Sequence, residues 1–133
     1  MTPRFDHEPL TPTAFLERAG TVFADRVGVV EGTTRYTWVQ FRERCLHFAG
    51  ALRDAGIEPG DRVAVLAPNS QVLLAAHHAV PWAGAVLVAL NTRITAADVA
   101  WILDHSGARL LIYDAAFAAT AVDAIAKAAS RID

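Results

Sequence analysis

Polar residues that could bind an anionic ligand follow three short apolar runs in this chain. The runs VAVL, VLVAL and LLIY are succeeded by Pro68-Asn69-Ser70, by Asn91-Thr92-Arg93 and by Asp114. If the runs form neighbouring parallel strands, these residues meet at the sheet edge where open α/β sheets bind ligands. Amides, hydroxyls and a guanidinium in that position could hold a phosphate or a carboxylate. Asn91 and Arg93 are therefore the candidate substrate-binding residues.

The same residues have a structural interpretation, and both alternatives stay open. Asn69 or Ser70, Thr95 and Asp114 stand where helix N-caps belong, because short polar side chains accept hydrogen bonds from the free N–H groups of a first turn. A cap does not need a guanidinium, so Arg93 has two alternatives, an ion pair that clamps a loop or a contact to a ligand. A module that binds a small ligand such as ATP or AMP at this edge is one function that fits the pattern.

Other reactive residue types are not arranged for catalysis. Cys45 is the only cysteine and falls on an apolar helical stripe, so we expect a buried small hydrophobe and not a nucleophile. His77 and His78 are adjacent, hence about 100° apart on a helix, and no metal site is expected. At least one of the two should pack beneath the sheet or against a neighbouring domain. No GxxxxGK[ST], GxGxxG or GxSxG motif occurs, so no catalytic, cofactor-binding or metal-binding residue is assigned.

Local patterns predict the elements of the N-terminal half. A helix opens at Thr11-Pro12, and its apolar face should consist of Phe15, Leu16, Ala19, Val22 and Phe23. The runs VGVVEG and TTRYT predict a hairpin. Thr37 and Gln40 fit a capping box at the start of a second helix, which should end near Gly56.

Strands and helices alternate from Gly60 onward. We expect strands at 63–66, 86–90 and 110–113, and helices at about 70–80, 95–105 and 115–129. Strands separated by helices pair in parallel, and continuously apolar runs are typical of strands covered on both faces. The predicted fold class is α/β, a small, mostly parallel sheet with flanking helices, in the order βαβαβα after an N-terminal helix and hairpin. Gly60 and Asp61 should lead into the first of these strands, and Gly84 should permit close packing.

Composition favours one folded domain over residues 1–133, with residues 1–10 flexible. Hydrophobic residues make up 53% and charged residues 20% of the chain, which excludes disorder driven by high charge. Twelve basic and 14 acidic residues are mixed along it, so neither nucleic acid nor an anionic membrane surface is an expected partner. A transmembrane segment over residues 72–90 is disfavoured because His77, His78, Pro81 and Gly84 interrupt it. The N-terminus lacks a secretion signal, so the cytoplasm is the expected compartment.

An ordered set of sequence segments over residues 10–114 resembles the opening of a known enzyme family. The segments are TPTAFLERAG with DRVGVVEG, RYTWVQF, ALRDAGIEPGDRVAVLAPNS, AVPWAGAVLVALNTR and ITAADVAWILDHSGARLLIYD. They are similar to the AMP-forming acyl-CoA synthetases of the adenylate-forming superfamily, and RYTWVQF resembles the family's first core motif, LTYxEL. Trp38 and Gln40 replace the motif's usual aromatic residue and glutamate, and Ala89 stands where many members have proline.

The resemblance implies a function for a longer protein. The family joins a carboxylic acid to ATP with the help of magnesium and transfers the acyl group to coenzyme A, and its catalytic motifs lie downstream of Asp133. The chain would then be a partial N-terminal subdomain, and its motif residues would have structural roles. These residues are Thr37, Gln40, Gly60, Asp61, Asn69, Gly84, Asn91 and Arg93. We expect an inactive scaffold of a fatty-acyl or aryl-acyl ligase, partnered by the remainder of its chain. The alternative is a standalone module that self-associates as a homo-oligomer or pairs with a separate catalytic chain.

Overall fold

The computed structural model describes residues 10–133, so all but the last of residues 1–10, which were expected to be flexible, lie outside the described part. Five α-helices and five strands occur there in the order α1 (Pro12–Val22), β1 (Val27–Glu31), β2 (Thr34–Thr37), α2 (Trp38–Asp54), β3 (Arg62–Leu66), α3 (Gln71–Trp82), β4 (Val86–Ala89), α4 (Ala96–Ser106), β5 (Ala108–Tyr113), a short 3₁₀ helix η1 (Ala115–Phe117) and α5 (Ala118–Lys127). The α/β class and the predicted element order are confirmed.

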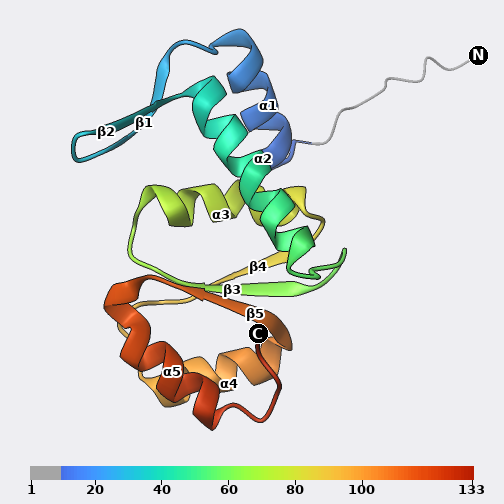
Figure 1. Cartoon of the computed structure of the whole chain (residues 1–133), viewed down its shortest axis with the longest axis vertical. Coiled ribbons are helices and arrows are strands. Elements are labelled where there is room, and N and C mark those ends of the chain that lie inside the picture. The colour runs from blue at the N-terminus through green and yellow to red at the C-terminus, as the bar shows by residue number, and fades with distance from the viewer. Residues whose placement is uncertain (1–9) are drawn as a thin grey trace, which may run out of the picture.

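A three-stranded parallel sheet forms the middle layer of the fold (Figure 1). Its strand order is β4-β3-β5, so the first strand of the alternating half is central. Helix α3 lies against one face with α1 and α2 beyond it, and α4 and α5 cover the other face (Figure 1). The antiparallel hairpin of β1 and β2 is a separate two-stranded sheet beside this stack.

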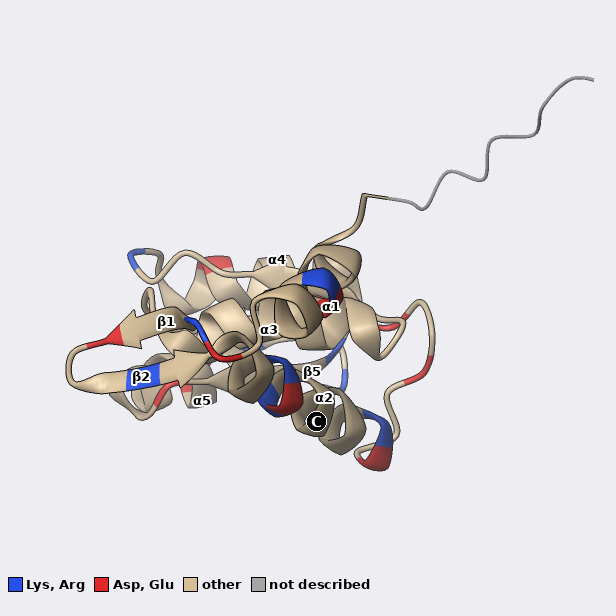
Figure 2. Ribbon diagram, turned by 90° about the horizontal axis from the view of Figure 1, so that it is seen from above, with Lys and Arg blue, Asp and Glu red and all other residues tan. Residues whose placement is uncertain are grey.

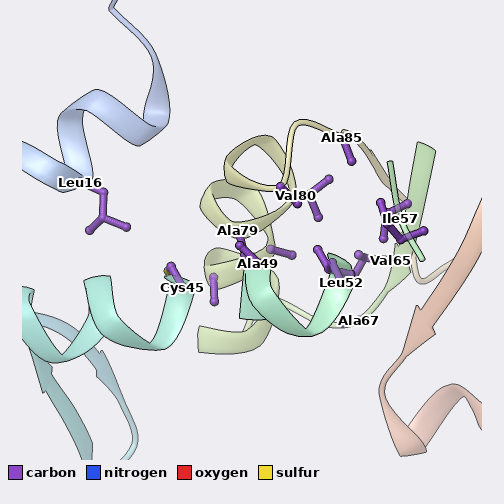
Figure 3. Packing of buried hydrophobic residues seen from close by; sticks show 14 of the residues in the cluster. Leu16, Cys45, Ala49, Leu52, Ile57, Val65, Ala67, Ala79, Val80 and Ala85 are labelled. Atoms are coloured by element: carbon purple, nitrogen blue, oxygen red, sulfur yellow. The ribbon is translucent and has the colours of Figure 1, made fainter. Parts of the chain in front are cut away.

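Central strand β3 divides the buried side chains into two cores. Successive strand residues point to opposite faces, and all five residues from Val63 to Ala67 are buried. Val63, Val65 and Ala67 belong to the core shared with α1, α2 and α3 (Figure 3). Ala64 and Leu66 belong to the core beneath α4 and α5. This explains the continuously apolar run of β3. Strand β4 lies at an edge, and its end residues Val86 and Ala89 are exposed. Its middle residues Leu87 and Val88 are partly buried against opposite cores, so the predicted cover on both faces holds only for the middle of this strand.

Helix α1 packs through a narrower face than the sequence predicts. Leu16 is 1% exposed, but Phe15 and Val22 are 57% and 58% exposed. The reason is Gly20, one turn after Leu16, which lets the side chain of Arg42 on α2 cross closely. A Cβ at Gly20 would lie 2.6 Å from Arg42 Cδ. The helices therefore meet along Leu16 and Gly20, and the expected face containing Phe15 and Val22 is wrong.

The predicted break after α3 occurs later than expected. The helix continues through Pro81 to Trp82 and turns at Gly84, where φ is +86°. Pro81 lies so near the C-terminal end of the helix that it removes only one backbone donor. The last turn remains helical because Ala83 N–H donates to the Ala79 carbonyl at 2.9 Å.

In the part of the chain that the structure describes, no helix is both long and apolar enough to cross a bilayer.

Long-range polar contacts fix the ends of the sheet. Arg62 on β3 donates from Nε and Nη2 to the carbonyls of Ser106 and Gly107, at 2.7 and 2.6 Å, and so satisfies the C-terminus of α4. Asp104 accepts from the N–H groups of Ala129 and Ser130 at 3.0 and 2.8 Å. Helix α5 ends at Lys127, before the predicted residue 129, and these bonds hold the segment that follows it.

Candidate functional site

Parallel pairing brings the predicted polar residues to one sheet edge. Strands β3, β4 and β5 run in the same direction, so their carboxyl ends lie together. Leu90 N–H donates to the Val65 carbonyl, and Asp114 N–H donates to the Leu66 carbonyl, both at 2.9 Å. The chain leaving β4 and the chain leaving β5 therefore flank the end of β3, as expected from the alternation of strands and helices.

Three of the polar side chains at this edge are engaged as helix caps. Ser70 Oγ accepts from Leu73 N–H at 3.3 Å, Thr95 Oγ1 accepts from Asp98 N–H at 3.2 Å, and Asp114 Oδ1 accepts from Ala116 N–H at 2.9 Å. Asp98 also accepts from both the hydroxyl and the backbone of Thr95, and these hydrogen bonds lower the pKa of its carboxyl. The cap interpretation is confirmed for Ser70, Thr95 and Asp114.

Asn91 and Arg93 form a tight turn after β4. Asn91 Oδ1 accepts from the backbone N–H of Arg93 at 2.9 Å, an Asx-type bond that fixes the chain between β4 and α4. Both residues are exposed. The ion pairs among residues 10–133 do not include Arg93, so the expected clamp is not formed there. A ligand contact by the Arg93 guanidinium stays a prediction.

Asn69 lies in a groove between the hairpin and α3. This groove has a volume of about 420 Å³ and is also lined by Val30, Leu74 and His77. Glu31, at the end of β1, accepts from the N–H of Gln71 at 3.2 Å and ties the hairpin to the start of α3. Asn91 and Arg93 are not among the residues that line this groove.

The two adjacent histidines have different surroundings. His78 Nδ1 lies 3.1 Å from the Pro12 carbonyl, which can only accept, so Nδ1 carries the proton. The ring meets Phe41 edge-on at 5.9 Å, and burial lowers its pKa. His78 thus packs against Pro12 of α1 and Phe41 of α2, and not beneath the sheet as one alternative expected. His77 is exposed and bonded to the Leu73 carbonyl of its own helix.

Cys45 is fully buried in α2, as expected, and burial raises the pKa of its thiol to about 12. A thiol this hard to ionise is a poor nucleophile at neutral pH. Within residues 10–133, no group of three His, Cys, Asp or Glu side chains is arranged to hold a metal ion.

Sequence reasoning missed a second groove, formed by β2, α2 and α3 and including Arg35, Arg44 and His47. Part of this groove could have been found from the sequence, because Arg44, His47 and Phe48 are spaced three and four residues apart and so share one face of a helix. The contributions of β2 and α3 depend on tertiary packing.

The residues at the sheet edge do not suit ATP, magnesium or coenzyme A as a complete site. Ser70, Thr95 and Asp114 are occupied by backbone donors, and Asn91 is turned toward the backbone of its own loop. Arg93 is the remaining charged candidate, and one guanidinium cannot hold a triphosphate and its cation. No chemical step is therefore assigned to these residues.

The sequence of this chain is similar to part of known enzymes. Residues 16–133 match the family described as AMP-binding enzyme. The chain is 44% identical over 120 residues to acetate–CoA ligase CCL3 of Humulus lupulus, covering 90% of this chain and 21% of that protein. It is 42% identical over 117 residues to the peroxisomal benzoate–CoA ligase of Arabidopsis thaliana, covering 88% and 20%.

Solved structures agree with the sequence matches. A benzoate CoA ligase from Burkholderia xenovorans LB400 superposes with a TM-score of 0.84 at 30% identity, covering 90% of this chain and 24% of the other. The chain spans about a fifth of the length of the curated relatives it matches. By the extent of the match, this chain belongs to the AMP-binding enzyme family, with the fold of the N-terminal subdomain of adenylate-forming CoA ligases.

Proposed function

We propose that this chain is the N-terminal scaffold portion of an acyl-CoA synthetase and is inactive on its own. The reaction of the whole enzyme would join a carboxylic acid, ATP and CoA to give acyl-CoA, AMP and pyrophosphate. The observation that carries the proposal is the match to CoA ligases over nearly the whole chain, which is only about a fifth of each relative. The use of the polar groups at the sheet edge as helix caps supports a structural role.

A scaffold role makes a positive prediction for a chimera. The segment of the Burkholderia xenovorans benzoate CoA ligase that superposes on this chain would be replaced by residues 10–133. If the chain is a ligase scaffold, the chimera should form benzoyl-CoA, because the remaining parts of that enzyme supply the chemistry. A folded chimera without activity would count against the proposal.

Inactivity of the isolated chain is tested by ATP–pyrophosphate exchange with acetate, benzoate and a long-chain fatty acid. We expect no exchange above a protein-free blank. The intact benzoate CoA ligase serves as the positive control, and its own matching segment serves as the control for truncation. Exchange that copurifies with the 133-residue chain, in a preparation free of longer ligases by mass spectrometry, would overturn the proposal.

Fatty and aryl acids are the proposed substrate class of the whole enzyme, and the cytoplasm is its proposed compartment. Relatives are named for acetate and for benzoate, and some are named peroxisomal. Peroxisomes are therefore the competing compartment, and imaging of a tagged full-length protein in its own cell would decide between the two.

A standalone interaction module is the second candidate, because apolar side chains are exposed around α1. More than two fifths of the surface is exposed in each of Phe15, Val22, Phe23 and Val27. Contiguous apolar surface of this kind marks sites of contact with other proteins. Light scattering of the chain should then show a dimer or larger species that Phe15→Ser returns to a monomer. A strictly monomeric chain at high concentration would rule this candidate out.

A further inference from the structure

The groove between β2, α2 and α3 has a lining that the scaffold role does not require. Its volume is about 640 Å³, within the usual range for small-molecule sites. Strand β2 contributes Arg35 and Tyr36, helix α2 contributes Arg44, His47 and Phe48, and helix α3 contributes Val72. In the view from above, β2 carries a basic residue, and α2 carries basic and acidic residues side by side (Figure 2). The groove therefore combines cationic and apolar walls.

Arg44 has an unused hydrogen-bond donor in this groove. Its Nε atom is buried and has no hydrogen-bond partner among the described residues. The guanidinium carbon lies 5.6 Å from the centre of the Tyr36 ring, a cation–π contact that holds the group near β2. A buried donor without a partner is costly, by about 1–3 kcal/mol in typical proteins. Neighbouring protein atoms cover Nε, so an acceptor in the groove removes that cost only if the guanidinium shifts toward it.

The two guanidinium groups of the groove also lack an ion-pair partner in the described part of the chain. Neither Arg35 nor Arg44 takes part in an ion pair within residues 10–133, although Glu43 is among the lining residues. Arg42, two residues before Arg44 on α2, instead binds Glu17 through two hydrogen bonds, at 2.7 and 2.6 Å. Helix α2 thus neutralises one guanidinium against α1 and leaves another available in the groove.

We propose that this groove binds a small organic anion, with a carboxylate or phosphate on the Arg44 guanidinium. Guanidinium groups bind both oxyanions through paired N–H donors. Phe48, Val72 and Ala75 provide the apolar wall, so the ligand needs an apolar body as well as its charge. Arg35, opposite on β2, would be a second contact for the anion. This site is independent of the scaffold role, which needs no ligand at this position.

The test follows the Arg44 Nε–Hε resonance of the ¹⁵N-labelled 133-residue chain during titration. Benzoate and phenyl phosphate are the two probes, and they distinguish a carboxylate ligand from a phosphate ligand. At least one should shift the resonance saturably. Benzamide, which has the shape of benzoate without its charge, should bind at least about tenfold more weakly, as expected when a charge-assisted hydrogen bond is lost. Inorganic phosphate should also bind more weakly because it lacks the apolar body.

Variants assign the binding to this groove. Arg44→Lys keeps the charge but loses Nε–H and the paired donors, and should weaken binding by about tenfold, measured from the amide shifts of His47 and Phe48. Arg35→Gln, on the exposed strand β2, provides a second variant should Arg44→Lys fail to fold. Arg131→Gln, 93% exposed in its side chain and far from the groove in sequence, is the matched control and should change nothing. Absence of any shift with both probes, equal binding of inorganic phosphate, or unchanged affinity in both groove variants would overturn the proposal.

Discussion

Cys45 is a thiol that the packing of α2 protects from reagents. Because burial raises its pKa to about 12 and leaves it fully enclosed, reaction with a disulfide reagent at pH 8 requires opening of the fold. We expect labelling at least about a thousandfold slower in buffer than in concentrated urea, for a domain of ordinary stability. The measurement is the rate of thiol release as urea increases. Labelling in buffer at the rate of a free thiol would show that α2 opens readily.

Asp104 stabilises the chain after α5 through its charge. The backbone N–H of Ala129, followed by that of Ser130, lowers the pKa of its carboxyl below the ordinary 3.8. A lowered folded-state pKa means that the stabilisation is present above pH 3.8 and is lost as the pH falls through the folded-state value. Asp104→Asn should therefore lower the urea midpoint at pH 7, and this difference should shrink in acid.

The control for Asp104 is Asp123→Asn, which removes an exposed pair with Lys127 and should change the midpoint little. Hydrogen exchange of the Ala129 and Ser130 amides gives an independent reading, because both should exchange faster in Asp104→Asn. An equal midpoint for wild type and Asp104→Asn at pH 7 would show that the carboxylate adds nothing beyond what an amide oxygen provides.

Among the elements, two glycines give opposite expectations for the same substitution. Gly84 has φ of +86°, and a Cβ there would lie 3.3 Å from Pro59 Cβ. Gly84→Ala should cost about 1–2 kcal/mol from the left-handed backbone alone. Gly50 lies within α2 and a Cβ there would meet nothing within 4 Å, so Gly50→Ala should stabilise by up to about 1 kcal/mol. Free energies of urea unfolding compare the two, and a neutral Gly84→Ala would mean that the turn after α3 relaxes.

Helix starts were predictable because their signals are local. Thr11 accepts from Ala14 N–H, and Thr37 and Gln40 form the reciprocal capping box expected from four consecutive residues. The face of α1 was not predictable, since it depends on how Arg42 crosses Gly20 from another helix. The central place of β3 depends likewise on non-local contacts, including Arg62 reaching Ser106 across 44 residues.

The candidate site likewise has features that depend on local sequence and features that depend on tertiary packing. A common sheet edge for Asn91 and Asp114 follows from alternating strands and helices, and the caps at that edge follow from residue type. The groove at Arg44 required the approach of β2 and α3 to α2, which no local pattern specifies. The sequence therefore predicts the position of a residue whose role is set within its own helix or strand, such as a cap. A groove that three elements build together can be located only from the packed structure.

For the whole molecule, β3 is the one described strand with buried residues in both cores, whereas the side chains that β4 and β5 turn toward the core of α2 and α3 are only partly buried. Its residues alternate between them, so loss of either core removes the cover from one face of the same strand. This shared strand is the physical reason to expect the chain to unfold as one unit, in keeping with the prediction of a single domain. Separate folding of the two halves would leave buried, apolar β3 residues exposed to water.

Single-tryptophan variants can test this cooperativity. Trp82 packs against the core of α2 and α3, whereas Trp101 lies on α4, stacked on His105 with ring centres 4.7 Å apart. With the other tryptophans replaced by phenylalanine, the two variants should show the same urea midpoint apart from the effects of those replacements. Leu66→Ala, which removes a fully buried side chain from the α4 and α5 core, should cost about 2–5 kcal/mol and shift both transitions equally. Val65→Ala, from the opposite face of β3, is the matched variant and should also shift both. If Leu66→Ala moved only the Trp101 transition and Val65→Ala only that of Trp82, the chain would consist of two separately folding units.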